Sequence, residues 1–323
     1  MVLQKSSNLK ASIAVIGCGY WGKNLIRNFY ELNVLNAICD DDKILAETYS
    51  KKYSVPRMNL EDILHSKDIN AIVIATPAKT HASIGLQALR AGMHVFIEKP
   101  LALSSLDAKK LIEMSKKYNK CLMVGHLLQY HPAFIKLKTI IKEKKIGNIK
   151  NIYSSRLSFG KIRNEEDVIW SFGPHDISMI LSLADSQVSN VKSSKSSFLQ
   201  KDITDIAHID IKFKNGINAH VHLSWINPIK ETKLVVIGDT GAIIFDDNQD
   251  WNSKLQLYSY NIDFKKSPPL IDKSRLEQIP VQDIEPLKDE CKTFINQIEN
   301  GTKSFSDGLE GLKVIQVIEK SMI

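Results

Sequence analysis

The chain has 323 residues and a mass of 36.4 kDa, which is too long for one ordinary hydrophobic core and predicts two domains. Its formal net charge of +7 comes from lysines spread along the whole chain, without a basic block interleaved with aromatics; this argues against a nucleic-acid partner and favours an anionic small substrate. No segment has the ~18 consecutive apolar residues of a membrane span, and the N-terminus lacks a signal-peptide stretch, so we expect a soluble, cytoplasmic protein with no membrane partner.

Short apolar runs rich in Val and Ile alternate with stretches of helical spacing in the first part of the chain. The apolar runs cover residues 12–16, 34–39, 71–75, 93–97 and 121–124. The helical stretches cover residues 21–31, 42–52, 59–66, 79–91 and 104–118. Continuous apolar runs fit strands that are covered on both faces, and their alternation with helices predicts a doubly wound parallel sheet. We therefore assign residues 1–125 to an α/β Rossmann domain.

The first predicted strand leads directly into the sequence GCGYWG at residues 17–22, where the first predicted helix begins. A GxGxxG sequence in this strand–turn–helix context predicts a dinucleotide-binding loop. Gly17 permits the tight turn, Gly19 lets the backbone approach a pyrophosphate, and Gly22 lets helix and strand pack closely. We expect the loop, including Tyr20 and Trp21, to contact the cofactor.

The second predicted strand ends in ICDDD, with Asp40 lying 18 residues beyond Gly22. An acid near this spacing hydrogen-bonds the adenosine ribose, and its charge repels the 2′-phosphate of NADP. Because no arginine directly follows Asp40, we predict that the cofactor is NAD.

The fourth predicted strand ends in the tripeptide Glu98-Lys99-Pro100. In an open parallel sheet, ligands bind beyond the carboxyl ends of the strands, so we expect Lys99 to face a nicotinamide. Pro100 restricts the turn that follows. The alternative is an ordinary solvated loop lysine.

From about Ile149 the apolar pattern changes to a period of two, which is typical of half-buried antiparallel strands. The alternating runs cover residues 151–159, 205–213, 217–225, 232–238, 242–246 and 254–260. Asn215-Gly216 between two of them predicts a hairpin. Helical stretches cover residues 171–184, 286–300 and 306–322. We therefore expect residues 126–323 to form an α+β domain with a large, mostly antiparallel sheet.

Several segments together resemble the glucose-fructose oxidoreductase, inositol dehydrogenase and rhizopine catabolism (Gfo/Idh/MocA) family. They are IAVIGCGYWGKN, IATPAKTHASIGLQALRAGMHVFIEKPLA, VGHLLQYHPAF and GPHDISMIL, of which Glu98-Lys99-Pro100 is the most specific part. The resemblance implies that Lys99 lies beside nicotinamide and substrate, next to Glu98 in the cofactor site. It also implies that Thr76 and Pro77 line the cofactor cleft and that His175 completes the catalytic pair.

The chain departs from the family pattern around His175. The family usually has an acid four residues before this histidine and another three residues after it, where this chain has Ser171 and Ser178. Asp176 is adjacent to the histidine instead, and Gln129 stands where many relatives have arginine. These departures weaken the transfer of sugar and polyol dehydrogenase roles, but they leave the catalytic pair intact.

The segments GHLLQYHPAF, GKIRNEEDVIWSFGPHD and SWINPIKE resemble dehydrogenases of bacterial surface-polysaccharide pathways. This resemblance implies oxidation of the C3 hydroxyl of a UDP-N-acetylated sugar, such as UDP-GlcNAc or its uronate, to a ketone that is later transaminated. The hypothesis is that His175 takes the hydroxyl proton while Lys99 stabilises the alkoxide. A desolvated Lys99 is the alternative base.

Basic and aromatic side chains near the histidine segment are candidates for binding a nucleotide sugar. Arg156, Lys161 and Arg163 could bind a diphosphate or carboxylate, although a solvated strand end would also explain them. Trp170 and Tyr130 could stack on sugar or uracil, although such aromatics are often core residues.

Two histidine features receive no catalytic assignment. His220 and His222 share one strand face without a third ligand, so we expect a sheet face or subunit contact and no metal. His81 either lines the cleft or packs at a helix start.

A broad period-two sheet face predicts a homodimer or homotetramer.

Three alternatives remain open from the sequence. The chain could be an NADPH-dependent 3-ketoreductase of nucleotide sugars, which Asp40 disfavours, or a sugar or polyol dehydrogenase. It could also be a non-enzymatic NAD-binding sensor, against which the presence of both Lys99 and His175 argues.

Overall fold

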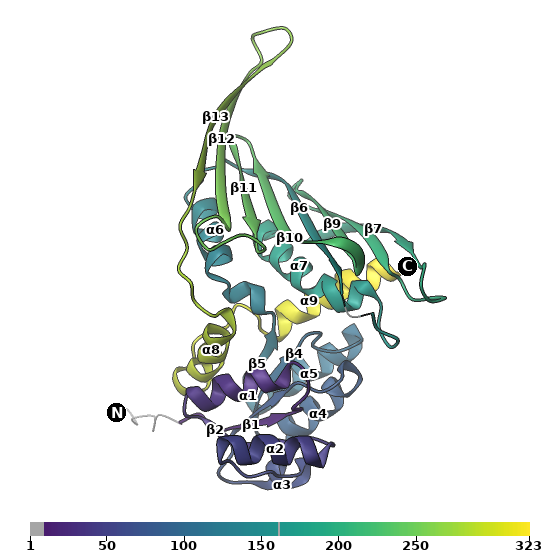
Figure 1. Cartoon of the computed structure of the whole chain (residues 1–323), viewed down its shortest axis with the longest axis vertical. Helices are drawn as coiled ribbons and strands as arrows, with labels where there is room; N and C mark the ends of the chain where they lie inside the picture. Colours follow the sequence, from purple (N-terminus) through teal and green to yellow (C-terminus); the bar gives the residue numbers. More distant parts are fainter. Residues whose placement is uncertain (1–9, 161) are drawn as a thin grey trace. The chain divides into compact units, whose positions relative to one another are not determined.

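In the computed structural model, which describes residues 10–160 and 162–323, the apolar runs of the first part form one parallel sheet (Figure 1). Its strands are β1 (Ile13–Ile16), β2 (Leu35–Cys39), β3 (Ala71–Ile74), β4 (His94–Glu98) and β5 (Leu122–Gly125), in the order β2-β1-β3-β4-β5. Every pair is parallel, and nearly all strand residues are buried. The predicted doubly wound sheet is confirmed, and burial on both faces explains its unbroken apolar runs.

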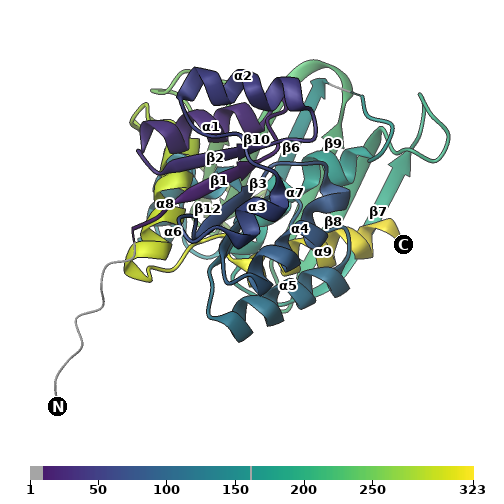
Figure 2. The ribbon, with the colours of Figure 1, turned by 90° about the horizontal axis from the view of Figure 1, so that it is seen from below.

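Helices cover both faces of the parallel sheet. They are α1 (Gly22–Glu31), α2 (Lys43–Tyr53), α3 (Leu60–His65), α4 (Ala78–Arg90) and α5 (Ser105–Tyr118). Helix α1 lies on one face, whereas α4 and α5 lie on the other (Figure 2). Side chains of Asp42, Asn59 and Ser104 cap the first turns of α2, α3 and α5.

A segment from the end of the chain also belongs to this first unit. The first unit contains the described residues up to Leu127 together with Glu285–Ile315, whereas the sequence prediction gave the whole range 126–323 to the second domain. Helix α8 (Pro286–Asn300) joins the first unit through its apolar face. Its Phe294 contacts Phe29 of α1 and Phe96 of β4, at ring-centroid distances of 6.5 and 5.7 Å.

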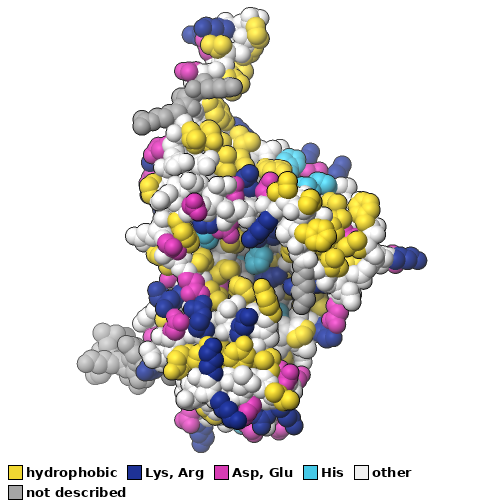
Figure 3. All heavy atoms as spheres, in the orientation of Figure 1, with side chains coloured by type: hydrophobic (Ala, Val, Ile, Leu, Met, Phe, Trp, Pro, Cys, Tyr) yellow, Lys and Arg dark blue, Asp and Glu magenta, His cyan; other side chains and the backbone are white. Residues whose placement is uncertain are grey.

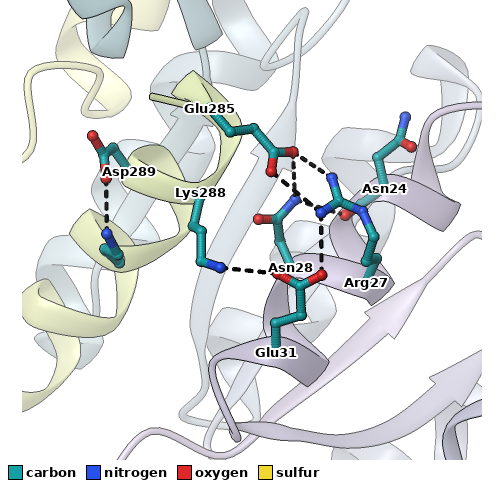
Figure 4. A network of polar contacts seen from close by, with 8 residues as sticks. Asn24, Arg27, Asn28, Glu31, Glu285, Lys288 and Asp289 are labelled. Atoms are coloured by element: carbon teal, nitrogen blue, oxygen red, sulfur yellow. Dashed lines mark hydrogen bonds and ion pairs between the residues drawn. The ribbon is translucent and has the colours of Figure 1, made fainter. Parts of the chain in front are cut away.

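A polar network fixes the start of α8 to α1 (Figure 4). The Glu285 carboxylate accepts from both terminal nitrogens of Arg27 and, at 3.1 Å, from the amide of Asn28. Lys288 forms an ion pair with Glu31 at 2.9 Å. The network joins two helices that are more than 250 residues apart in the chain.

The second unit, residues 128–284 and 316–323, contains an eight-stranded sheet in the order β13-β12-β11-β10-β6-β9-β8-β7. Its strands are β6 (Ile149–Phe159), β7 (Val188–Ser196), β8 (Ile206–Phe213), β9 (Asn218–Ser224), β10 (Ile226–Gly238), β11 (Gly241–Asp246), β12 (Leu255–Asp263) and β13 (Leu270–Gln278). Only β6 and β9 pair in parallel among these described strands, so the predicted mostly antiparallel sheet is confirmed. The predicted hairpin turn joins β8 to β9, with Gly216 at φ 89°.

The second unit also contains the short 3-10 helix η1 (Leu127–Tyr130), which starts at the unit boundary, α6 (Pro132–Lys142), α7 (Val168–Ala184) and the end of α9 (Gly308–Met322). Helices α6 and α7 pack on the sheet, and the end of α9 is hydrogen-bonded to β7. The sequence prediction lacked α6, β7 and β13. Helix α6 begins with Pro132 in its first turn and is capped by His131, whose Nδ1 accepts from the backbone of Ala133.

The β12–β13 hairpin extends beyond the rest of its sheet and carries apolar and basic side chains at its end (Figure 3). Phe264 is 76% exposed there, and Leu270 and Ile271 are also exposed. Across the described residues, no helix is long and apolar enough to cross a membrane.

Candidate active site

The carboxyl ends of β1 to β4 bring the predicted cofactor residues to one edge of the parallel sheet. The residues that follow these strands are the glycine loop after β1, Asp40 after β2, Thr76 and Pro77 after β3, and Lys99 after β4. This edge is where an open α/β sheet binds its ligand. All of these residues belong to the first unit, so a single fold determines their arrangement.

The glycine loop has the close approaches that the sequence motif requires. Gly17 has φ 98°, and its N–H donates to the carbonyl of Cys39 at 2.8 Å. A Cβ on Gly22 would lie 1.9 Å from the carbonyl oxygen of Gly17, whereas a Cβ on Gly19 would meet nothing within 4 Å. Two glycines therefore close the turn, and the third leaves open space at the start of α1 for a pyrophosphate.

Asp40 holds the glycine loop from the end of β2. Its Oδ2 accepts from the backbone N–H of Cys18 at 2.5 Å, and its Oδ1 accepts from Asp42 at 2.8 Å. The carboxylate thus lies beside the loop, as expected for a group that contacts the adenosine ribose of a bound dinucleotide. The residues present at this edge fit a dinucleotide cofactor.

The loop after β3 is tied to the loop after β4 by His81. This buried histidine of α4 has Nε2 2.9 Å from the carbonyl oxygen of Thr76 and Nδ1 2.7 Å from that of Pro100. Thr76 also shares a hydroxyl contact with Thr80 at 2.7 Å, and Pro77 is the N-cap of α4. The sequence alone did not assign a role to His81, and the structure gives it two backbone contacts within the candidate site.

Glu98 is a buried residue at the end of β4. Trp21 of the glycine loop donates its indole N–H to Oε1 at 2.6 Å, and the backbone N–H of Lys99 donates to Oε2 at 3.2 Å. Burial raises the pKa of Glu98 to about 7, and the hydrogen bond from Trp21 and the charge of Lys99 oppose this rise. Glu98 therefore links the glycine loop directly to the backbone of Lys99.

A second buried acid, Glu290 of α8, was missed by the sequence analysis. Its side chain is fully buried, and neither carboxylate oxygen has a hydrogen-bond partner among the described residues. Burial and then the negative charge of Glu98 raise its pKa well above the ordinary value. The sequence contained one signal, because position 290 falls on the helical face of Leu287, Phe294 and Ile298, where an acid is unexpected.

Replacing Glu290 with glutamine is expected to change how stability depends on pH. Because the folded state raises its pKa, Glu290 contributes stability below about pH 4.5 that is lost as the pH rises toward the folded-state pKa. The variant lacks this loss. Above about pH 4.5, its free energy of unfolding relative to that of the wild type should therefore increase by up to about 1.4 kcal/mol per pH unit. Urea unfolding at a series of pH values measures the slope.

The matched control for Glu290→Gln is Glu113→Gln, since Glu113 is exposed on α5. The control should follow the wild type at every pH. A constant difference between Glu290→Gln and the wild type across the range would contradict the assignment of a raised pKa.

In the second unit, His175 lies on α7, three residues before Ser178 on the same helix. The adjacent Asp176 is buried and accepts from Ser154 at 2.5 Å and from the Nε of Arg156 at 2.5 Å. Arg156 was a candidate diphosphate contact, but its guanidinium is paired with Asp176. The ion pair holds α7 to β6 at the residue that follows His175.

Two of the departures from the family pattern, Gln129 and Ser178, contact each other. The side-chain amide of Gln129 donates to the hydroxyl of Ser178 at 2.9 Å and to its carbonyl oxygen at 3.0 Å. Both residues are almost completely buried. Gln129 and Ser178 thus form a neutral hydrogen-bonded pair at the positions where many relatives have arginine and an acid. Because both charges are replaced together, no buried charge is left without an ion-pair partner.

The remaining predicted substrate residues have different environments. Tyr130 is only 2% exposed, which fits the alternative that it is a core residue and not a substrate contact. Trp170 is half-buried in the first turn of α7, capped by Asp167. Arg163 is exposed and pairs with Glu166 at 2.9 Å, and Lys161 lies outside the described residues.

The histidines of the large sheet form surface contacts. His222 stacks on His208 across the β8–β9 pair, with ring centroids 4.2 Å apart, and His220 pairs with Asp210. In the part of the chain that the structure covers, no group of three or more His, Cys, Asp or Glu residues is arranged to hold a metal ion.

Comparisons with known proteins agree with this architecture. The UDP-N-acetylglucosamine 3-dehydrogenase of Acidithiobacillus ferrooxidans is 24% identical to this chain over 304 residues, which is 93% of each protein. A crystal structure of that enzyme superposes with a TM-score of 0.86 and covers 97% of this chain and 96% of its own. A 3-ketoreductase from Actinomadura kijaniata, solved with NADP, superposes with a TM-score of 0.83 at 16% identity and 97% coverage of both chains.

Two family models match consecutive parts of the chain. The model of the oxidoreductase family with an NAD-binding Rossmann fold matches residues 11–126. The model of the Gfo/Idh/MocA C-terminal domain matches residues 134–244. The chain therefore belongs to the Gfo/Idh/MocA oxidoreductase family.

Proposed function

We propose that this oxidoreductase uses NAD to oxidise the C3 hydroxyl of a UDP-N-acetylated sugar to a ketone. The observation that carries the proposal is the position of Lys99, at the carboxyl end of β4 and linked through Glu98 to the glycine loop. Similarity to a UDP-N-acetylglucosamine 3-dehydrogenase over nearly the whole chain supports the substrate class. The product would be a 3-keto sugar, which an aminotransferase of surface-polysaccharide synthesis could consume.

The residues of the chain divide the work of this reaction. The glycine loop and Asp40 would hold the dinucleotide, and the bound nicotinamide would accept a hydride from C3. His175 takes the proton of the C3 hydroxyl, because a neutral imidazole is a suitable base near pH 7. Lys99 stabilises the negative charge that develops on the C3 oxygen.

NAD is proposed as the cofactor because of Asp40. Its carboxylate lies beside the glycine loop, where the 2′-phosphate of NADP would be repelled. The described residues Asp41 and Asp42 follow it and add two further acids at the same turn.

Asp40→Asn is expected to weaken the preference for NAD. The amide keeps an acceptor oxygen for the loop but removes the charge, so the Kd for NADP should fall by about tenfold, while the Kd for NAD rises by less than that. Fluorescence titration with both cofactors measures the two constants. If the wild-type protein bound NADPH more tightly than NADH, the assigned role of Asp40 would be wrong.

For the substrate, we propose that Trp170 contacts the sugar and Arg163 the diphosphate. Trp170 is half-buried near the start of α7, and Arg163 precedes that helix with its guanidinium exposed. Arg156 is left out, because its side chain is only 16% exposed and pairs with the buried Asp176, whereas the side chain of Arg163 is 44% exposed beside Glu166.

The large sheet also supports a proposal about assembly. Tyr153, Val235, Ile237 and Ile244 alternate with residues that face α6 and α7, and they remain partly exposed. A face of this kind is suited to an isologous contact, so we propose a homodimer or homotetramer. Light scattering of the protein in solution would determine the state.

The function is tested by incubating the protein with NAD and a panel of UDP-sugars while the absorbance of reduced nicotinamide is followed. Formation of NADH with a UDP-N-acetylated sugar, and a 3-keto product identified by mass spectrometry after trapping with an aminotransferase, would support the proposal. Turnover only in the reverse direction with NADPH would favour a 3-ketoreductase. Cofactor binding without any turnover would favour a sensor.

A further inference from the structure

One carboxylate joins two loops at the carboxyl edge of the parallel sheet. Glu98 Oε1 accepts from the indole Nε1 of Trp21 at 2.6 Å, although the two residues are 77 positions apart in the sequence. Glu98 Oε2 accepts from the backbone N–H of Lys99 at 3.2 Å. The dinucleotide loop is thus connected to the residue that the proposed function places beside the substrate.

The Glu98 carboxyl group is enclosed by its surroundings. Glu98 is in register with Gly125 of β5, where a Cβ would lie 2.9 Å from the carboxyl carbon and both oxygens. On the other side of Lys99, His81 contacts the carbonyl of Pro100 at 2.7 Å. Buried side chains therefore fix the backbone on both sides of Lys99.

We propose that Trp21 is a positioning residue whose indole N–H, by holding the ionised Glu98, orients Lys99 for the reaction. The inference rests on the proposed function for the role of Lys99 and adds to it a link from the glycine loop. Trp21 forms the N-cap of α1, at the end of the loop that would hold the pyrophosphate. Cofactor seated on this loop and the orientation of Lys99 are therefore coupled through the two hydrogen bonds that Glu98 accepts, from Trp21 and from Lys99.

The charges around Glu98 show why the indole donor matters. Burial favours the neutral acid, whereas Trp21, Lys99 and His126 favour the carboxylate. On α8, Glu290 and Cys291 are the titratable groups that interact with Glu98, and the charge of Glu98 disfavours the ionised form of both. Without the indole N–H the balance moves toward the neutral acid, which is a weaker acceptor for the Lys99 backbone.

Trp21→Phe tests the link because it keeps an aromatic ring and removes the donor. We expect kcat at about pH 7 to fall about tenfold, and the loss to shrink to about twofold near pH 9, where Glu98 is ionised in both proteins. In a Glu98→Gln background the same substitution should change kcat by less than about twofold. Trp251→Phe, which removes an indole N–H from the second unit, should leave the pH profile unchanged.

A second readout does not depend on turnover. The four tryptophans of the chain give four indole N–H signals in ¹⁵N-labelled protein, and Trp21→Phe identifies one of them. That signal should titrate with a midpoint near pH 7 in the wild type and should not titrate in Glu98→Gln. If no sugar is oxidised, the proposed function fails, and this titration still tests the link.

Two results would overturn the inference. One is an indole signal of Trp21 that stays constant from about pH 5 to 9, since the indole would then not sense the ionisation of Glu98. The other is a loss of kcat in Trp21→Phe that is equal at every pH and unchanged by Glu98→Gln, because this would indicate a general structural defect.

Discussion

Replacing Lys99 with methionine is expected to lower kcat by at least about 100-fold, while the Kd for NAD changes by less than about threefold. Methionine keeps much of the aliphatic stem but cannot stabilise an alkoxide or take a proton. The proposed cofactor contacts lie mainly in the glycine loop and at Asp40, which the substitution does not touch. Initial rates of NADH formation and fluorescence titration with NAD measure the two quantities.

The control is Lys109→Met, because Lys109 is exposed on α5 and should not affect either quantity. His175→Gln should give a decrease in kcat comparable to that of Lys99→Met, again with NAD binding retained. Turnover that stays within about threefold of the wild type in either variant would remove that residue from the mechanism.

The second large effect is expected from Gly22→Ala, which should destabilise the protein by at least about 2 kcal/mol. A Cβ at this position would lie 1.9 Å from the carbonyl oxygen of Gly17, and both atoms belong to the buried junction of β1 and α1. Neither backbone can move without breaking the turn that Gly17 makes with φ 98°. Urea unfolding measures the loss.

Gly19→Ala is the matched comparison, since a Cβ there would meet no protein atom within 4 Å. Its unfolding free energy should stay within about 0.5 kcal/mol of the wild type. Its Kd for NAD should nevertheless rise at least about tenfold, because the methyl group would occupy space needed by the pyrophosphate. Unchanged NAD binding in this variant would show that the cofactor does not approach the loop at Gly19.

Strong local patterns made the first half of the fold predictable. The apolar runs at residues 71–75 and 93–97 became β3 and β4 because a strand buried on both faces must be apolar at every position. The edge strands β7 and β13 were missed for the converse reason. A strand with one neighbour buries few side chains, and β7 has no fully buried residue to create an alternating signal.

The cofactor half of the candidate site could be located from the sequence, whereas the contacts that support it could not. Gly17, Asp40 and Lys99 follow predicted strands, so the topology of a parallel sheet places them on one edge. The hydrogen bond between Trp21 and Glu98 and the burial of Glu290 depend on packing between distant segments, which no local pattern reports.

By itself, the sequence determined the two classes of sheet and the order of strands and helices around the glycine loop. Helix and strand geometry set the spacing at which buried residues recur, and this spacing can be read from neighbouring positions in the chain. Only the tertiary structure decided that α8 packs on the parallel sheet, that Arg156 is paired with Asp176, and that Gln129 contacts Ser178. These contacts join segments many residues apart, and their energies depend on distance and burial in space.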